Sequence, residues 1–228
     1  MPGKFITLEG GEGAGKTTCL KHLEKLIRQS GVDLCVTREP GGTRTGEKIR
    51  EILLDRGNID ILDETELMLM FAARSQHLNE LIRPALAADT WVLCDRFTDA
   101  TYAYQGGGRG ISQERIAELE QWVQQGLQPD LTLLLDLPVE VGLQRAGQRS
   151  TPDRFESENI AFMQRMRSTY LDIAAREPER VKIIDQRGLY KPTNFVSSAS
   201  AWYANCPGEV FIYKHRRGVI RNFTDLAL

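Results

Sequence analysis

The stretch that decides the fold lies near the start of the chain, where residues 10–17 read Gly10-Gly11-Glu12-Gly13-Ala14-Gly15-Lys16-Thr17. It matches the pattern G-x-x-x-x-G-K-[ST], in which the backbone N–H groups of a glycine-rich loop surround a phosphate. An apolar run precedes it at residues 5–8, and apolar side chains recur at helical spacing after it. A strand, a glycine loop and a helix in this order direct several backbone N–H groups at one anion. The stretch therefore predicts binding of a nucleoside triphosphate, with Lys16 at the β- and γ-phosphates and the Thr17 hydroxyl on Mg²⁺.

Length, charge and cysteine content limit the classes of protein to consider. The 228 residues suffice for one α/β domain with a sizeable core, and a net charge of −2 does not support a nucleic-acid binder. The four cysteines form no C-x-x-C pair, so we expect Cys19, Cys35 and Cys94 to be buried free thiols. No signal peptide precedes the first strand and no apolar run reaches membrane-spanning length, so we expect a cytoplasmic protein without a membrane partner.

Apolar runs alternate with helical patterns along the chain, which is typical of a parallel sheet with crossover helices. The sequence predicts strands at 4–9, 33–37, 90–95, 131–136 and 181–184. It predicts helices at 16–29, 45–56, 64–88, 112–126, 138–147 and 156–176. Together with the glycine loop, these elements predict a P-loop NTPase fold of class α/β. We expect a doubly wound parallel five-stranded sheet flanked by helices, which forms one domain over residues 1–186.

The last part of the chain, residues 187–228, has a different character. Gly, Pro, Ser and Asn are scattered through it, and helical periodicity disappears. A short basic cluster at residues 214–217 is typical of a solvated surface, and a phosphate-binding role is the alternative. The sequence predicts no structure for this tail.

Two charged residues, Asp95 and Arg96, lie at the end of the predicted strand 90–95. An acidic residue at the end of a strand in this fold, here Asp95, is placed to hold Mg²⁺ directly or through water. A strand-end salt bridge is the alternative. The planar guanidinium of Arg96 is suited to a second phosphate group.

The predicted helix 64–88 carries an arginine on its apolar face. Arg74 shares that face with Leu67, Phe71, Leu78 and Ile82. A buried arginine is costly unless it is paired or bound to a ligand. Arg74 therefore either meets a core carboxylate or reads the polar edge of a flat ring.

Two further segments are suited to ligand binding. Residues 98–110 combine tyrosine and glutamine with a run of glycines, although an ordinary loop would look the same. The segment 145–155 combines Arg145, Arg149 and Arg154 with small residues, as in a lid that shields phosphoryl transfer from water. A solvated basic turn is the alternative for this second segment.

These segments together resemble the bacterial thymidylate kinase (dTMP kinase) family over about residues 3–185. The matching stretches are Leu8–Thr18, Thr37-Arg38-Glu39-Pro40-Gly41-Gly42-Thr43, Phe71-Ala72-Ala73-Arg74, Asp95-Arg96-Phe97 and Ala103-Tyr104-Gln105-Gly106-Gly107-Gly108-Arg109-Gly110. The resemblance implies the reaction ATP + dTMP → ADP + dTDP, dependent on Mg²⁺ and carried out by a homodimer. The residues that it assigns to ATP are Gly10, Gly11, Glu12, Gly13, Ala14, Gly15, Lys16, Thr17 and Thr18, and those that it assigns to Mg²⁺ are Thr17 and Asp95.

The resemblance also implies roles toward the nucleoside of dTMP. Glu12 would accept a hydrogen bond from the 3′-hydroxyl, and Arg74 would read thymine O4. Thr101 and Gln105 would complete recognition of the base. Tyr104 would lie under C2′, where a ribose hydroxyl would clash.

Arginines supply the catalytic charge in this scheme. Arg96, with Arg50 and Arg38, would hold the acceptor phosphate. Because the P-loop contains no arginine, Arg149 and Arg154 of the lid would provide the positive charge for the transition state. With Lys16, the predicted catalytic residues are thus Arg96, Arg149 and Arg154. The acceptor phosphate is itself the nucleophile, so no general base is needed.

The sequence departs from the family pattern at two places. The phenylalanine that stacks on thymine usually lies four residues before the arginine, where this chain has Met70, and Phe71 follows one residue later. Both residues are therefore candidates for the base-binding site. The amphipathic helix that usually follows the last strand is missing from the pattern after Gln186. A different nucleotide kinase, a hydrolytic NTPase and an ATP-binding protein without activity are the alternatives.

Overall fold

Five parallel strands form one sheet in the computed structural model, which describes residues 2–58, 60–147 and 154–186. The strands are β1 (Phe5–Glu9), β2 (Leu34–Arg38), β3 (Trp91–Asp95), β4 (Leu131–Asp136) and β5 (Val181–Asp185). They lie in the order β2-β3-β1-β4-β5, and every neighbouring pair is parallel. The strands predicted from apolar runs are confirmed, with ends that differ by no more than one residue.

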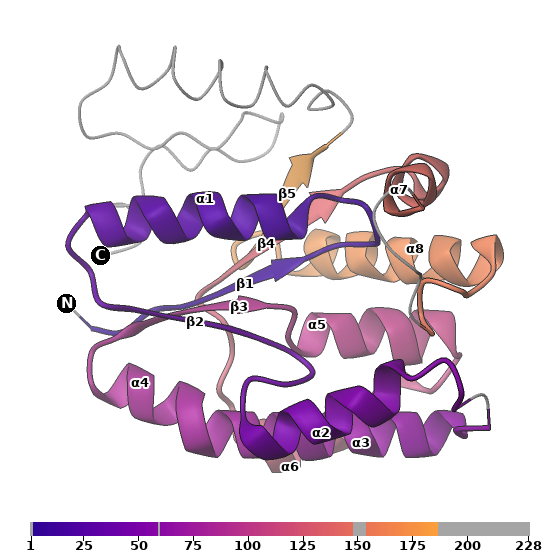
Figure 1. Ribbon diagram of the computed structural model, residues 1–228, viewed down its shortest axis with the longest axis horizontal. Helices are drawn as coiled ribbons and strands as arrows, with labels where there is room; N and C mark the ends of the chain where they lie inside the picture. Colours follow the sequence, from indigo (N-terminus) through magenta and orange to yellow (C-terminus); the bar gives the residue numbers. More distant parts are fainter. Residues whose placement is uncertain (1, 59, 148–153, 187–228) are drawn as a thin grey trace.

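Helices cover both faces of this sheet (Figure 1). They are α1 (Lys16–Gln29), α2 (Arg44–Leu54), α3 (Asp63–His77), α4 (Arg83–Ala87), α5 (Thr98–Thr101), α6 (Gln113–Gln124), α7 (Val139–Ala146) and α8 (Ile160–Arg176), with the π-helical segments η1 (Leu78–Ile82) and η2 (Tyr102–Gly108). On one face, Leu23 and Ile27 of α1 pack in a buried cluster with Leu133 of β4. On the other face, Leu134 lies in a cluster with Phe162 of α8. The doubly wound arrangement is thus confirmed.

Glycines shape the P-loop between β1 and α1. Gly10 has φ 137° and Gly13 has φ 68°, backbone conformations that L-residues with side chains rarely adopt. A Cβ atom on Gly13 would lie 2.1 Å from the backbone oxygen of Gly142 in α7. The loop therefore packs directly on α7, and a side chain at either position would force it outward.

Most of the segment 98–110, for which the sequence left an ordinary loop as an alternative, is helical. Here α5 begins two residues after β3 and continues directly into η2, which packs against α8. A Cβ atom on Gly108 would lie 2.4 Å from Cε2 of Phe162, and one on Gly107 would lie 2.1 Å from Oγ1 of Thr169. The glycines in this stretch thus permit close helix packing.

Other predictions need adjustment. The single predicted helix 64–88 is a continuous run of α3, η1 and α4, with a π-helical segment in the middle. Cys94 is buried as expected, but Cys19 and Cys35 are only half-buried, so the prediction was wrong for these two thiols. In the described ranges, no helix combines the length and apolarity needed to cross a bilayer. Arg149, most of the predicted lid and the tail 187–228 lie outside the described residues.

Candidate active site

A cavity of about 280 Å³ opens at the carboxyl ends of β1, β2 and β3. Ligands of open parallel sheets bind at this edge, where the loops after neighbouring strands meet. The sequence-predicted residues that line it are Glu12, Gly13, Ala14, Gly15, Lys16, Thr17, Arg38, Arg50, Met70, Arg74, Asp95, Arg96, Thr101, Tyr104 and Gln105. The cavity therefore joins the P-loop to the predicted base-binding residues.

Lys16 lies across the P-loop. Its Nζ donates to the backbone oxygens of Gly10 and Gly11, each at 3.0 Å. Burial lowers the pKa of Lys16 and Arg96 lowers it further, while Glu12 opposes both. Gly15, the N-cap of α1, provides no side-chain cap for the first N–H groups of the helix. A phosphate in the loop would meet an ammonium group together with these N–H donors.

Asp95 and Thr17 form the metal-binding side of the cavity. Oδ1 of Asp95 is buried and has no hydrogen-bond partner among residues 2–58, 60–147 and 154–186. Such an oxygen is costly to bury unless a ligand or ion meets it. Thr17 is exposed to the same cavity. Carboxylate and hydroxyl oxygens suit Mg²⁺, so these two residues fit that ion.

An ion pair links the P-loop to the end of β3. Nη2 of Arg96 donates to Oε1 of Glu12 at 2.7 Å, and the Tyr104 hydroxyl donates to the same oxygen at 2.8 Å. Burial alone raises the pKa of Glu12, but Lys16, Arg96 and Tyr104 outweigh burial and lower that pKa to about 2. Arg96 has φ 72°, an uncommon conformation for a residue with a side chain, and such conformations concentrate at functional sites.

Arg74 pairs with a core carboxylate and also keeps a group that can bind a ligand, so the structure is consistent with both alternatives that the sequence left open. It is 2% exposed, and its Nε donates to the buried carboxylate of Glu39 at 2.8 Å. Its Nη2 donates to Thr101 Oγ1 at 2.9 Å. Its Nη1 is buried without a hydrogen-bond partner in the described part of the chain, although Arg74 lines the cavity. One edge of the guanidinium is thus fixed by protein, and the NH₂ group of Nη1 remains for a ligand.

Sequence reasoning missed the carboxylate that holds Arg74. Glu39 lies in the loop after β2, and its other oxygen is 3.0 Å from Nδ1 of His77. A Cβ atom on Gly42 would lie 2.5 Å from Nε2 of His77, so glycine is needed for this packing. The signal was present in the segment Thr37–Thr43, but the spacing did not reveal the partner of Glu39.

Met70 and Phe71 lie in different environments. Met70 lines the cavity, whereas Phe71 is buried in a small cluster with Ile116 and is not among the lining residues. The prediction that Phe71 binds substrate directly is therefore not matched by its position. Phe97, which sequence reasoning did not assign to the site, lines the cavity, and its ring centroid lies 5.1 Å from Cζ of Arg74.

The arginines from β2 and α2 lie at the edge of the cavity. Nη2 of Arg38 donates to Glu47 at 2.9 Å, and Nη1 of Arg50 donates to the backbone oxygen of Pro40 at 2.8 Å. Both line the cavity, but Arg38 is largely exposed, with 54% of its side-chain surface accessible. Arg96 lines the same cavity, and guanidinium groups are suited to bind an anion there.

Arg154 does not line the cavity. Its Nη2 donates to Glu66 at 2.6 Å, and its Nε donates to the backbone oxygen of Leu53 at 2.9 Å. The prediction that Arg154 meets the transferred phosphoryl group is not matched by this position, because a buried carboxylate holds its guanidinium. Phe155 and Glu156, which follow it, do line the cavity. Arg149 is outside the described residues.

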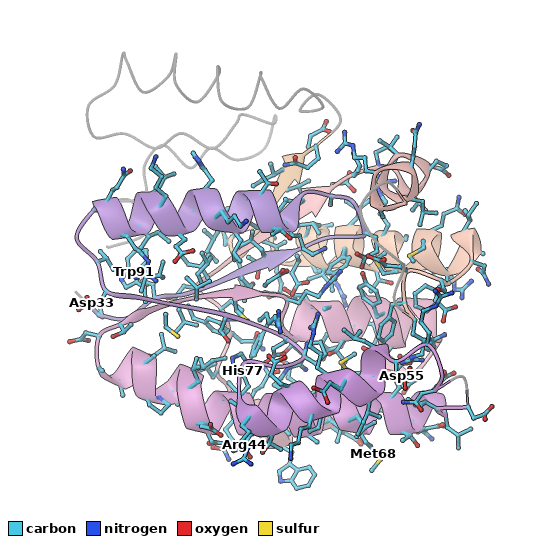
Figure 2. The ribbon with its side chains drawn as sticks, in the orientation of Figure 1. Asp33, Arg44, Asp55, Met68, His77 and Trp91 are labelled. Carbon is cyan, nitrogen blue, oxygen red and sulfur yellow. The ribbon has the colours of Figure 1, made fainter. Side chains whose placement is uncertain are left out.

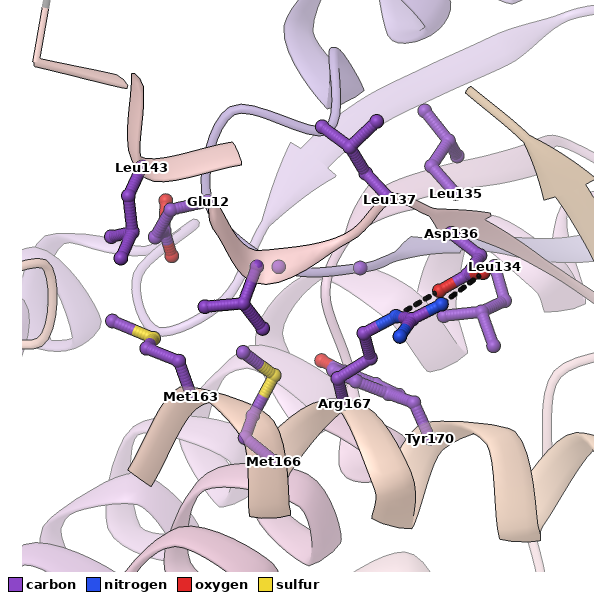
Figure 3. Close-up of a pocket in the computed structure, with 13 residues that line it drawn as sticks. Glu12, Leu134, Leu135, Asp136, Leu137, Leu143, Met163, Met166, Arg167 and Tyr170 are labelled. Carbon is purple, nitrogen blue, oxygen red and sulfur yellow. Dashed lines mark hydrogen bonds and ion pairs between the residues drawn. The ribbon is translucent and has the colours of Figure 1, made fainter. Parts of the chain in front are cut away.

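A second, much smaller cavity of about 20 Å³ lies behind the P-loop, between β4, α7 and α8 (Figure 3). Met163 and Met166 of α8 line it, and Arg167 pairs with both carboxylate oxygens of Asp136, at 2.7 and 2.9 Å. It has room for about one water molecule. Residues of β4, α7 and α8 thus pack around the P-loop residues that line this small cavity.

Comparison with known proteins identifies the family. The thymidylate kinase family model matches residues 8–193. Thymidylate kinases of Pseudomonas syringae pv. tomato and Ectopseudomonas mendocina are 60% and 58% identical over 185 residues, or 81% of this chain and 88% of each relative. The crystal structure of thymidylate kinase from Ehrlichia chaffeensis has a TM-score of 0.69 and 32% identity, and the match covers 90% of this chain and 100% of that one. The chain belongs to the thymidylate kinase family.

Proposed function

We propose that this protein transfers the γ-phosphoryl group of ATP to dTMP and releases ADP and dTDP, a step in the supply of dTTP. One observation carries this proposal beyond family membership. A single cavity contains Lys16 of the P-loop and, at Arg74, a buried guanidinium donor without a partner among the described residues. A phosphoryl donor fits the end of the cavity at Lys16, and a base with a hydrogen-bond acceptor on its edge fits the end at Arg74.

The acceptor nucleotide would lie between these ends. Arg96, together with Arg38 and Arg50, would hold its phosphate, which is supported by the fact that all three line the same cavity. Glu12 would accept from the sugar hydroxyl, and its low pKa keeps it an acceptor at neutral pH. The base would lie among Met70, Phe97, Arg74, Thr101 and Gln105, with Tyr104 beside the sugar.

Mg²⁺ would be held by Asp95 and Thr17, whose oxygens fit it. When bound there, it neutralises charge on the phosphates of ATP. The chain itself supplies the remaining positive charge, through Lys16 and Arg96. Arg149 of the lid would add a further guanidinium at the transferred group.

Alignment of the two nucleotides is the main contribution to catalysis in this proposal. The dTMP phosphate is ionised at neutral pH and attacks without loss of a proton to the protein. No side chain is therefore required as a general base. The P-loop and Arg96 hold donor and acceptor on opposite sides of the transferred group and reduce the entropic cost of the encounter.

A homodimer in the cytoplasm is the proposed working form. Two large apolar side chains are exposed on helices that pack together, with Met68 of α3 64% accessible and Trp122 of α6 76% accessible. Met68 projects from α3 away from the sheet in Figure 2. Exposed apolar groups of this size on adjacent helices are suited to a subunit interface. Sedimentation equilibrium of the full chain measures its mass in solution.

A coupled assay of ADP release tests the reaction. ADP formed with dTMP, and much less with UMP, CMP, AMP or GMP, supports the proposal. ADP formed at the same rate without any acceptor would indicate a hydrolytic ATPase. Folded protein that binds ATP and dTMP but forms no ADP would indicate a binding protein without activity.

A further inference from the structure

A buried carboxylate of α3 lies where the base end of the cavity meets the predicted lid. Glu66 is 0% exposed, and its Oε1 accepts from Nε2 of Gln105 at 2.7 Å. Its Oε2 accepts from Nη2 of Arg154 at 2.6 Å and from Nη2 of Arg109 at 3.2 Å. Arg109 also pairs with Glu158 at 2.5 Å. Glu66 thus binds Gln105 of the cavity as well as Arg154.

The Glu66 carboxylate dictates which way the Gln105 amide faces. Two guanidinium groups donate to it, so both of its oxygens act as acceptors. Only the NH₂ end of the amide can bond to such a group, and the reversed amide would place two oxygens against each other. The carbonyl Oε1 of Gln105 is therefore the end left for the cavity.

The cavity thus presents one acceptor and one donor at its base-binding end. Gln105 lines it, and its Oε1 has no hydrogen-bond partner within the described ranges. Arg74 also lines this end of the cavity, and its Nη1 donor is without a partner among the described residues. This pair matches the N3–H donor and O4 acceptor of thymine or uracil. Cytosine presents the opposite pattern, with an N3 acceptor and an N4 donor.

We propose that Glu66 is a positioning residue that selects thymine over cytosine by fixing the orientation of the Gln105 amide. It acts through Gln105 and does not contact the substrate. The inference rests on the proposed dTMP kinase activity and on Gln105 as a base-binding residue. Because a buried polar group without a partner is costly, the fixed amide disfavours cytosine, whose N3 acceptor would face Oε1 of Gln105.

The test is the Glu66→Gln variant, with kcat/KM measured for dTMP and for dCMP. The neutral amide at position 66 accepts or donates, so Gln105 becomes free to turn its NH₂ toward N3 of cytosine. The ratio of kcat/KM for dTMP to that for dCMP should fall at least about tenfold, the effect of losing one directed hydrogen bond. KM for ATP should change by less than about twofold. The ratio is independent of the fraction of enzyme that is folded.

Glu158→Gln is the matched control, because it removes a carboxylate that pairs with Arg109 but does not touch Gln105. Its ratio should equal that of the wild type. If Glu66→Gln alone does not fold, the double variant Glu66→Gln/Arg154→Gln is compared with the single variant Arg154→Gln. The second substitution removes the Arg154 cation that Glu66→Gln would leave without its carboxylate.

The outcomes separate this inference from the proposed function. A wild-type enzyme that forms no dTDP would overturn the proposed function before any variant is compared. A wild type that prefers dTMP, together with an unchanged ratio in the Glu66 variant, would overturn only the role of Glu66. An equal fall of the ratio in Glu158→Gln would also overturn it, because the effect would then belong to the arginine cluster.

Discussion

Arg96 and Glu12 join the two halves of the site through an ion pair of 2.7 Å between Nη2 and Oε1. Glu12 belongs to the loop that would bind ATP, and Arg96, which directly follows β3, would hold the acceptor phosphate in the proposed reaction. In that proposal the pair fixes the donor and acceptor subsites relative to each other. Both side chains are mostly buried, at 17% and 16% exposure, so solvent weakens the attraction less than at an open surface.

Replacing Glu12 with glutamine should weaken this link and reduce turnover of dTMP. The amide keeps the shape of the side chain but loses the charge that holds Arg96. We expect kcat/KM for dTMP to fall about 10- to 100-fold, the range for a lost hydrogen bond to a charged group. Steady-state kinetics with saturating ATP measures it. Glu140→Gln, at an exposed position in α7 beside the P-loop, is the control, and an equal effect of both variants would contradict the role of the pair.

Arg74→Lys should raise KM for dTMP and leave KM for ATP unchanged. Lysine keeps a positive charge beside Glu39 but removes the Nη1 donor that has no partner in the described chain. The loss of one donor at a base edge corresponds to a rise of about tenfold or more in KM. Initial rates at varied dTMP and varied ATP separate the two constants. An Arg74→Lys enzyme with wild-type KM for dTMP would contradict this assignment, and Arg115→Lys, at an exposed site on α6, controls for general effects.

Asp95→Asn should raise the Mg²⁺ concentration needed for half-maximal activity without lowering stability. The buried Oδ1 of Asp95 lacks a hydrogen-bond partner among the described residues, so asparagine, which has the same shape, breaks no hydrogen bond at this atom in the metal-free protein. We expect the half-saturating Mg²⁺ concentration to rise at least about tenfold, since a carboxylate ligand or its hydrogen bond to a bound water is lost. Titration with MgCl₂ after treatment with EDTA provides the measurement. A variant with unchanged Mg²⁺ dependence and lower Tm would instead assign Asp95 a structural role.

Glu9 should make the stability of the protein depend on pH. Burial raises the pKa of Glu9 to about 8, from an ordinary value of 4.5, and the nearby charge of Asp99 raises it further. Because the pKa is higher in the folded state, this group contributes stability that is fully present below about pH 4.5 and is lost as the pH rises through about 8. The Glu9→Gln variant lacks this dependence. The difference in Tm between variant and wild type should therefore shift in favour of the variant from pH 5 to pH 8.5, as thermal unfolding followed by circular dichroism would detect.

A difference in Tm between Glu9→Gln and wild type that does not change with pH would contradict the raised pKa of Glu9. Glutamine can bond to the same two groups as Glu9. Its oxygen accepts from the backbone N–H of Phe97, and its NH₂ donates to the Tyr170 hydroxyl, which reverses the direction of the hydrogen bond that Tyr170 donates to Glu9. Measurements of the same pair of proteins in one set of buffers remove the contribution of all other carboxyls.

Gly108→Ala should destabilise the fold by about 1–3 kcal/mol, the usual cost of overpacking. The new Cβ would lie 2.4 Å from the Phe162 ring, so η2 and α8 would have to separate. Urea denaturation measures the change in the free energy of unfolding. Gly147→Ala is the control, because its Cβ would meet only ordinary contacts at 3.5 Å. A loss as large in Gly147→Ala would contradict the packing explanation.

Much of the fold followed from local pattern. The P-loop and the strands were predictable because glycine spacing and continuous apolar runs are local signals that burial in a parallel sheet requires. The pairing of Arg74 with Glu39 was not, because 35 residues separate them in the chain and only the tertiary fold brings them together. The choice between Met70 and Phe71 depends on a rotation of about 100° along a helix, which apolar character alone does not resolve. The helix at 98–108 was also not predicted, because a run of glycines is typical of a loop. Here the glycines instead permit close packing against α8.

Transfer of labelled phosphoryl from ATP to dTMP tests the central claim most directly. With γ-labelled ATP, Mg²⁺ and the full chain, the account predicts that the label appears in dTDP, that it depends on dTMP, and that Lys16→Ala abolishes the transfer. Label released as inorganic phosphate at the same rate with and without dTMP, or dTDP formed by Lys16→Ala at the wild-type rate, would contradict it.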